Sequence, residues 1–252
     1  MANTITDAFD HNLIVVLISY FVSVAGVLVS LFVADYVHDR KGRIRFDWLG
    51  LAAIVFGSCG VWAMHFIGTL AYQLGTPVSY GIDLVLLSLV IPLIFGYFSF
   101  YMAYRSPTNG VALLLAGVVF GFGVFAMHYT ALASMRIAAE ISYVPWIVGV
   151  TALLSVVAVA ASLHVFTRWR GAARRLSPYL IAALMAAVHY TGMASMRVGL
   201  SDAVEVDYFS GALSRDAMTF VLSVEVVVTL LIGVALILAR KITDLEEPGF
   251  AG

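Results

Sequence analysis

Three histidines lie inside apolar stretches of membrane length, each within a similar short phrase. His65 occurs in WAMHF, His128 in AMHYT and His189 in AVHYT. The last two phrases continue as HYTALASMR and HYTGMASMR, which agree at seven of nine positions. An imidazole is costly to bury in hydrocarbon, and it commonly binds an ion or relays a proton there. The repetition therefore predicts one shared site built from three copies of a motif.

The residue types around these histidines favour a soft metal. Met193 and Met196 follow His189 by four and seven residues, so the three would share one helix face. Met64 and Met127 directly precede their histidines. Imidazole nitrogen with thioether sulfur suits copper, Cu(I) especially, whereas zinc more often recruits thiolate or carboxylate. The alternative for each methionine is ordinary packing. The predicted metal ligands are His65, His128, His189, Met64, Met127 and Met193.

A second group of residues could support these ligands. Tyr129 and Tyr190 directly follow their histidines and could orient an imidazole, with interior packing as an equal alternative. Glu225 falls near the same depth in the last apolar stretch, where a carboxylate needs a partner. We expect a ligating histidine or an arginine to be that partner. Met135 and Met196, seven residues after His128 and His189, complete the supporting set.

Composition indicates an integral membrane protein. Of the 252 residues, 62% are hydrophobic and 12% charged, and the mean hydropathy is +0.99. A formal charge of −1 offers no basic face for phosphates, so nucleic-acid binding is not expected. Cys59 is the single cysteine, which excludes an internal disulfide. The first twelve residues carry no Lys or Arg, so we expect the first apolar stretch to remain as a span.

The apolar stretches predict an all-α fold with seven transmembrane helices. We expect one domain over 1–240 and a short polar tail over 241–252. The short connecting loops leave no room for a soluble catalytic domain, so no enzyme activity is expected. The predicted spans lie near 13–37, 47–73, 82–104, 110–138, 144–167, 177–200 and 218–240.

The distribution of charge predicts the orientation. Eleven of the fourteen Lys and Arg residues fall on one side of this topology, and most acidic residues on the other. The positive-inside rule then places the N-terminus outside and the C-terminus in the cytoplasm. The second, fourth and sixth spans run in parallel, and their histidines lie about nine to eleven residues from the outer ends. At 1.5 Å per residue they share one layer to within roughly 3 Å, as a three-armed metal cage requires.

At these residues the chain resembles the MHYT-domain family of bacterial membrane sensors. The family is named for the tetrapeptide MHYT, and residues 127–130 are a full copy of it. The first copy reads MHFI from Met64, and the third reads VHYT from Val188. The resemblance implies a seven-helix domain in the bacterial inner membrane that binds copper through motif Met and His residues. It further implies that O2, CO or NO is sensed and that cyclic-di-GMP signalling domains are partners. Val188 cannot ligate a metal, which leaves the third copy short of a sulfur.

Two other functions stay open at this point. Histidines on two helices could clamp a haem in a membrane redox protein. The histidines and Glu225 could instead form a metal or proton path in a transporter. Zinc is the alternative to copper in the predicted site.

Overall fold

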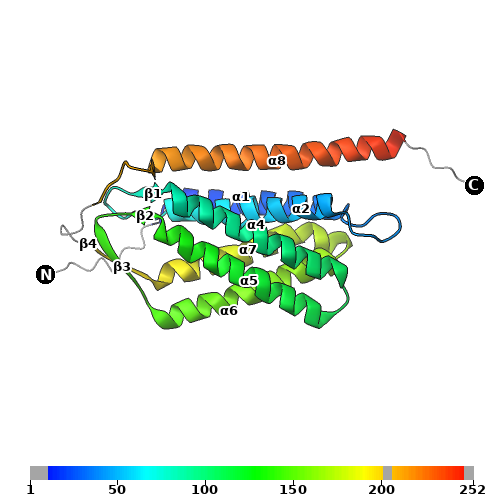
Figure 1. Cartoon of the computed structure of the whole chain (residues 1–252), viewed down its shortest axis with the longest axis horizontal. Coiled ribbons are helices and arrows are strands. Elements are labelled where there is room, and N and C mark those ends of the chain that lie inside the picture. Colours follow the sequence, from blue (N-terminus) through cyan, green and yellow to red (C-terminus); the bar gives the residue numbers. More distant parts are fainter. Residues whose placement is uncertain (1–10, 201–205, 247–252) are drawn as a thin grey trace, which may run out of the picture.

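The computed structural model describes residues 11–200 and 206–246. Within these ranges seven helices are long and apolar enough to cross a membrane, and they form one bundle (Figure 1). This confirms the predicted all-α class and the seven spans. The spans are α1 (Leu13–Ala34), a continuous second span of α2 (Phe46–Val55), η1 (Phe56–Ala63) and α3 (Met64–Leu70), α4 (Ile82–Arg105), α5 (Gly110–Ala133), α6 (Pro145–Arg168), α7 (Gly171–Ser195) and α8 (Arg215–Glu246).

Local sequence explains where several helices begin. The Asn12 carboxamide oxygen accepts hydrogen bonds from the first free amides of α1, at 3.0 and 3.3 Å. Asn109 caps α5 in the same way, at 2.9 and 3.2 Å. Pro145 occupies the first turn of α6, where its missing N–H leaves no intrahelical bond unmade.

The predicted fourth and sixth spans are too long at their C-terminal ends. α5 ends at Ala133 and α7 at Ser195, and the chain continues in extended strands. These strands carry apolar residues, so hydropathy alone cannot separate them from the helix. Met135 and Met196 therefore lie in strands, and the prediction that Met196 shares a helix face with His189 is wrong.

Two small antiparallel sheets cover the end of the bundle where these helices stop (Figure 1). In one, β1 (Ser79–Gly81) lies between β2 (Met135–Arg136) and β5 (Ala212–Ser214). In the other, β3 (Ala139–Tyr143) pairs with β4 (Met196–Leu200), with Glu140 opposite Gly199. The turn into α7 and the loop between α1 and α2 lie at the opposite end. There the Arg174 guanidinium pairs with Asp35 at 2.6 Å and joins α7 to α1.

The second span is the most enclosed one, and its middle is a π-helix. Of its most apolar window, 78% is buried, against 17% for α8. The Ser23 hydroxyl of α1 donates to the Gly60 carbonyl within η1 at 2.7 Å, and the Trp62 indole donates to Ser88 of α4 at 3.0 Å. π-turns are rare and recur at functional sites. His65 lies two residues after the end of η1, as the second residue of α3.

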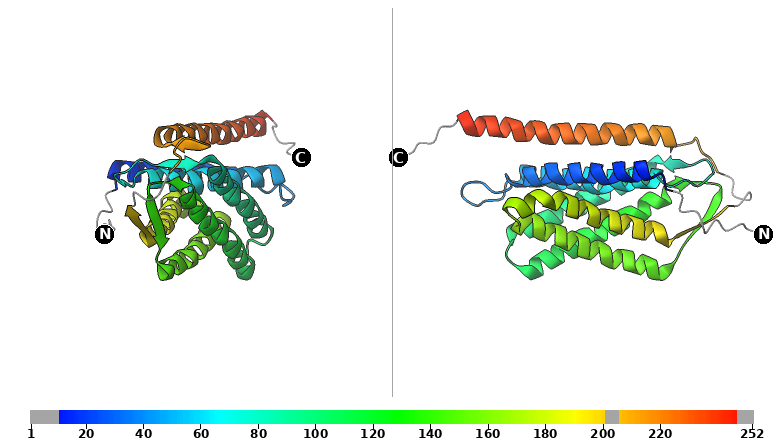
Figure 2. Two further views of the ribbon diagram at one scale, coloured as in Figure 1. Left: turned by 60° about the vertical axis from the view of Figure 1, so that its left-hand side comes forward. Right: turned by 180° about the vertical axis from the view of Figure 1, so that it is seen from behind.

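Helix α8 lies along one flank of the bundle, drawn in orange to red in Figures 1 and 2. It packs against α1 and the second span and leaves most of its apolar surface exposed. It continues to Glu246, so the first residues of the predicted tail are helical.

Candidate metal centre

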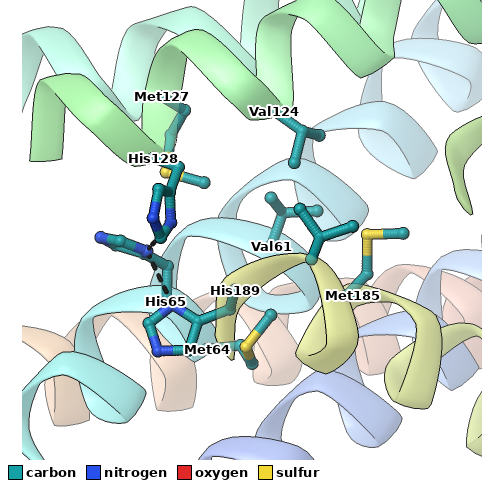
Figure 3. Close-up of a pocket in the computed structure, with 9 residues that line it drawn as sticks. Val61, Met64, His65, Val124, Met127, His128, Met185 and His189 are labelled. Carbon is teal, nitrogen blue, oxygen red and sulfur yellow. Dashed lines mark hydrogen bonds between the residues drawn. The ribbon is translucent and has the colours of Figure 1, made fainter. Parts of the chain in front are cut away.

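The three motif histidines meet at one point inside the bundle (Figure 3). The Nδ1 atom of His65 lies 3.0 Å from Nδ1 of His189 and 3.0 Å from Nδ1 of His128. One possible ligand atom from each of the three rings lies within 4.8 Å of the other two. The side chains are 1 to 2% exposed and come from three different spans. The predicted convergence of the three histidines is therefore confirmed.

The helix ends set the depth of this cluster. His65 lies five residues before Leu70, His128 five before Ala133 and His189 six before Ser195. At 1.5 Å per residue the cluster is roughly 8 to 9 Å inside the end covered by the sheets. The predicted depth of nine to eleven residues was too great because the helices stop earlier than hydropathy indicated.

Two glycines pack closely against two of the histidine rings. A Cβ atom on Gly68 would lie 2.6 Å from Nε2 of His189, and one on Gly192 would overlap Nε2 of His128. Both glycines follow a motif histidine by three residues, so the first and third motif copies each leave room for a histidine ring from another helix. This close approach directs the Nδ1 atoms inwards.

Hydrogen bonding alone leaves these rings unsatisfied. A neutral ring nitrogen either donates one proton or accepts one, yet Nδ1 of His65 faces two other Nδ1 atoms. Among the described residues, the Nε2 atoms of all three rings have no hydrogen-bond partner. A cation between the Nδ1 atoms would engage three lone pairs at once, with the protons on Nε2. The donor set therefore suits a metal ion.

The space beside the rings is small. The cavity has a volume of about 10 Å³, enough for one water-sized particle. A haem needs a pocket of several hundred Å³, so this site does not fit the haem alternative. Nine residues line the cavity: Val61, Met64, His65, Val124, Met127, His128, Met185, Val188 and His189.

Comparison with known proteins identifies the motif. The family model described as "Bacterial signalling protein N terminal repeat", MHYT, matches twice, over residues 59–117 and 121–178. The chain belongs to the MHYT family. The two matches contain His65 and His128, and the copy around His189 lies beyond them.

The curated relatives of this MHYT domain are signalling proteins. The bifunctional diguanylate cyclase/cyclic di-GMP phosphodiesterase MucR of Pseudomonas aeruginosa is 30% identical over 93% of this chain and 34% of its own length. The cyclic di-GMP phosphodiesterase NbdA of the same species is 31% identical over 72% of this chain and 24% of its length. The signaling protein YkoW of Bacillus subtilis is 24% identical over 75% of this chain and 22% of its own length.

The chain thus spans about a third of these relatives or less. The matches cover the MHYT sensor region of multidomain proteins and not their catalytic domains. No solved structure matches. The family and the seven apolar helices make the chain a multi-pass membrane protein with a sensor-like domain.

The predicted sulfur residues separate into two groups in the MHYT domain. Met64 and Met127, two of the predicted metal ligands, line the cavity beside the histidines. Met193 is 2% exposed but is not one of the nine lining residues. Met185, which sequence reasoning missed, lines the cavity instead. The available signal was its spacing, because Met185 precedes His189 by four residues and shares its helix face.

The two motif tyrosines pack edge-on against their histidines. Ring centroids are 5.0 Å apart for His128 and Tyr129 and 4.7 Å apart for His189 and Tyr190. The Tyr129 hydroxyl bonds Ser195 at 3.1 Å, not an imidazole. Tyr190 also packs against His11, at 5.8 Å. Sequence reasoning assigned no role to His11, because its contact with Tyr190 depends on tertiary structure.

Glu225 does not have the partners that the sequence suggested. Its carboxylate oxygens lie 3.7 and 3.9 Å from the Cys59 sulfur, and Thr229 donates to it at 3.1 Å. Among the residues that the structure describes, neither a histidine nor an arginine makes one of these contacts. Glu225 instead joins α8 to the π-helix that precedes His65.

Proposed function

We propose that this MHYT domain is a copper-binding sensor of the bacterial inner membrane. His65, His128 and His189 hold the ion, with sulfur from Met64 and Met127. The observation that carries the proposal is the meeting of three buried Nδ1 atoms beside a cavity of about 10 Å³. Neutral nitrogen and sulfur donors favour Cu(I) over zinc, which prefers thiolate and carboxylate.

The signal is a diatomic gas, O2, CO or NO, or the redox state of the membrane. Copper in such a site supplies redox chemistry and affinity for these small molecules. The enclosing residues of this chain exclude water and hold the imidazoles in place. A signal passes on only if the ligand binds two arrangements of the protein unequally.

Helix α8 passes the signal on in this proposal. It contacts η1 through Glu225 and Cys59, so a shift of η1 that accompanies binding at His65 reaches α8 directly. The partner is a cytoplasmic cyclic-di-GMP signalling domain or protein, as the names of the relatives support. The sensor region itself carries out no catalysis.

Metal analysis of the purified protein tests the proposal. Wild-type protein, purified under reducing conditions and incubated with Cu(I), should retain about one copper per chain. His65→Ala, His128→Ala and His189→Ala should each lose most of it, because two imidazoles leave the ion undercoordinated. Circular dichroism should show an unchanged helical content. Wild-type copper retention in all three variants would refute the site.

A further inference from the structure

We infer that Met185 supplies the sulfur that the third motif copy lacks at Val188, so that every arm gives the metal cavity one thioether. The inference rests on the proposed function, since it concerns the same site. It adds a metal-facing residue that lies outside the motif.

The residues that line the cavity follow one rule in all three arms, that is, in the three spans that carry a motif histidine. Each arm contributes its histidine, the residue just before it and the residue four before it. These positions stand on one side of each helix, so the three arms surround the cavity with equivalent positions. The lining sets are His65, Met64 and Val61; His128, Met127 and Val124; and His189, Val188 and Met185.

The third arm has the same composition in exchanged order. The first two arms have methionine directly before the histidine and valine four before it. The third has valine at 188 and methionine at 185, and both line the cavity. Met64, Met127 and Met185, one from each span, all line the cavity. Figure 3 shows Met64 and Met127 beside the histidine rings and Met185 farther from them, beyond Val61. The exchange therefore keeps one imidazole, one thioether and one valine per arm.

The side of the rings on which the cavity lies explains why position 185 can take this role. In all three arms the lining residues precede the histidine along the helix, so the cavity lies on the N-terminal side of the rings. Met193 lies four residues beyond His189 on the other side. Both methionines are buried, at 1 and 2% exposure, but only Met185 lines the cavity.

Three thioethers give the cavity a preference among metals. Sulfur of this kind binds Cu(I) well and Zn²⁺ poorly. Loss of one thioether should therefore lower Cu(I) affinity more than Zn²⁺ affinity. A packing residue would affect neither, or both alike.

The experiment compares Met185→Leu with Met193→Leu in the full chain. Leucine keeps the volume and removes the sulfur, and thermal unfolding checks that both variants fold. Competition with a chelator should show Cu(I) affinity lowered on the order of tenfold in Met185→Leu, with a smaller change for Zn²⁺. Met193→Leu is the matched control and should bind both metals as wild type does. Unchanged Cu(I) affinity in Met185→Leu, or an equal loss in Met193→Leu, overturns the inference.

An exchange variant gives a second test. Met185→Val alone should bind Cu(I) weakly, and adding Val188→Met should restore much of the affinity by giving the third arm the order of the other two. No recovery would contradict the equivalence of the two positions. His128→Ala separates the two proposals: if it keeps its copper, the proposed function fails. If it loses copper while Met185→Leu does not, only the present inference fails.

Discussion

The histidine rings owe their inward direction to what lies behind them. Nε2 of His128 abuts Gly192 and Nε2 of His189 abuts Gly68, so two of the three rings are held against a glycine of a neighbouring helix. None of these glycines can ligate a metal. Their contribution is the space that a Cβ atom would take.

Gly192→Ala tests this role at the residue scale. The added methyl overlaps Nε2 of His128 and must displace the ring, so copper retention should fall severalfold although every ligand is present. Ala131→Gly, the equivalent change in the second arm, adds no atom and should leave retention intact. Gly192→Ala with wild-type copper content would show that the glycine does not position the ring.

Sequence alone predicted the histidines, because their repetition and hydrophobic setting are visible without coordinates. It named Met193 and missed Met185, although both lie four residues from His189 on the same helical face. The place of the cavity, on the N-terminal side of the three rings, distinguishes Met185 from Met193. The partners of Glu225 were beyond prediction, because they depend on which helix α8 packs against.

At the scale of elements, η1 connects the site to the rest of the bundle. Its eight residues carry Cys59, which contacts Glu225, and Gly60, whose carbonyl accepts a hydrogen bond from Ser23. His65 follows it, so the winding of η1 sets the direction of that ring. Hydropathy predicted a span here but not its π-helical winding, which is a tertiary effect.

Ser23→Ala removes one of the bonds that hold η1. The Gly60 carbonyl would then lack its partner, and unfolding in detergent should become easier by about 1 kcal/mol. Copper affinity should fall as well, because His65 loses its fixed direction. Ser162→Ala is the control, since that hydroxyl bonds within its own helix, at the Ala158 carbonyl. Equal copper affinity in Ser23→Ala and wild type would show that this hydrogen bond to η1 does not affect metal binding at His65.

At the scale of the molecule, the sheets and the basic loops lie at opposite ends. The spans and their number followed from hydropathy, whereas the sheets did not, since their short strands continue the apolar helices. The histidines lie near the sheet end. If the positive-inside rule holds, that end faces outward and α8 runs towards the cytoplasm.

Cysteine labelling tests this orientation. Cys59 is the only cysteine and is fully buried, so it gives a low background. In intact cells a membrane-impermeant maleimide should label Glu140→Cys, at the sheet end, and spare Lys41→Cys, at the basic end. Both positions are exposed and should react once the membrane is opened. The reverse pattern would invert the topology.

X-ray absorption spectroscopy of the copper-loaded protein tests the central claim most directly. The account predicts scattering from three imidazoles bound to one copper at about 2 Å. In His65→Ala, His128→Ala or His189→Ala, any copper that is still bound should show scattering from one imidazole fewer. A spectrum without imidazole scattering, or with the same number of imidazoles in the variants, would contradict it.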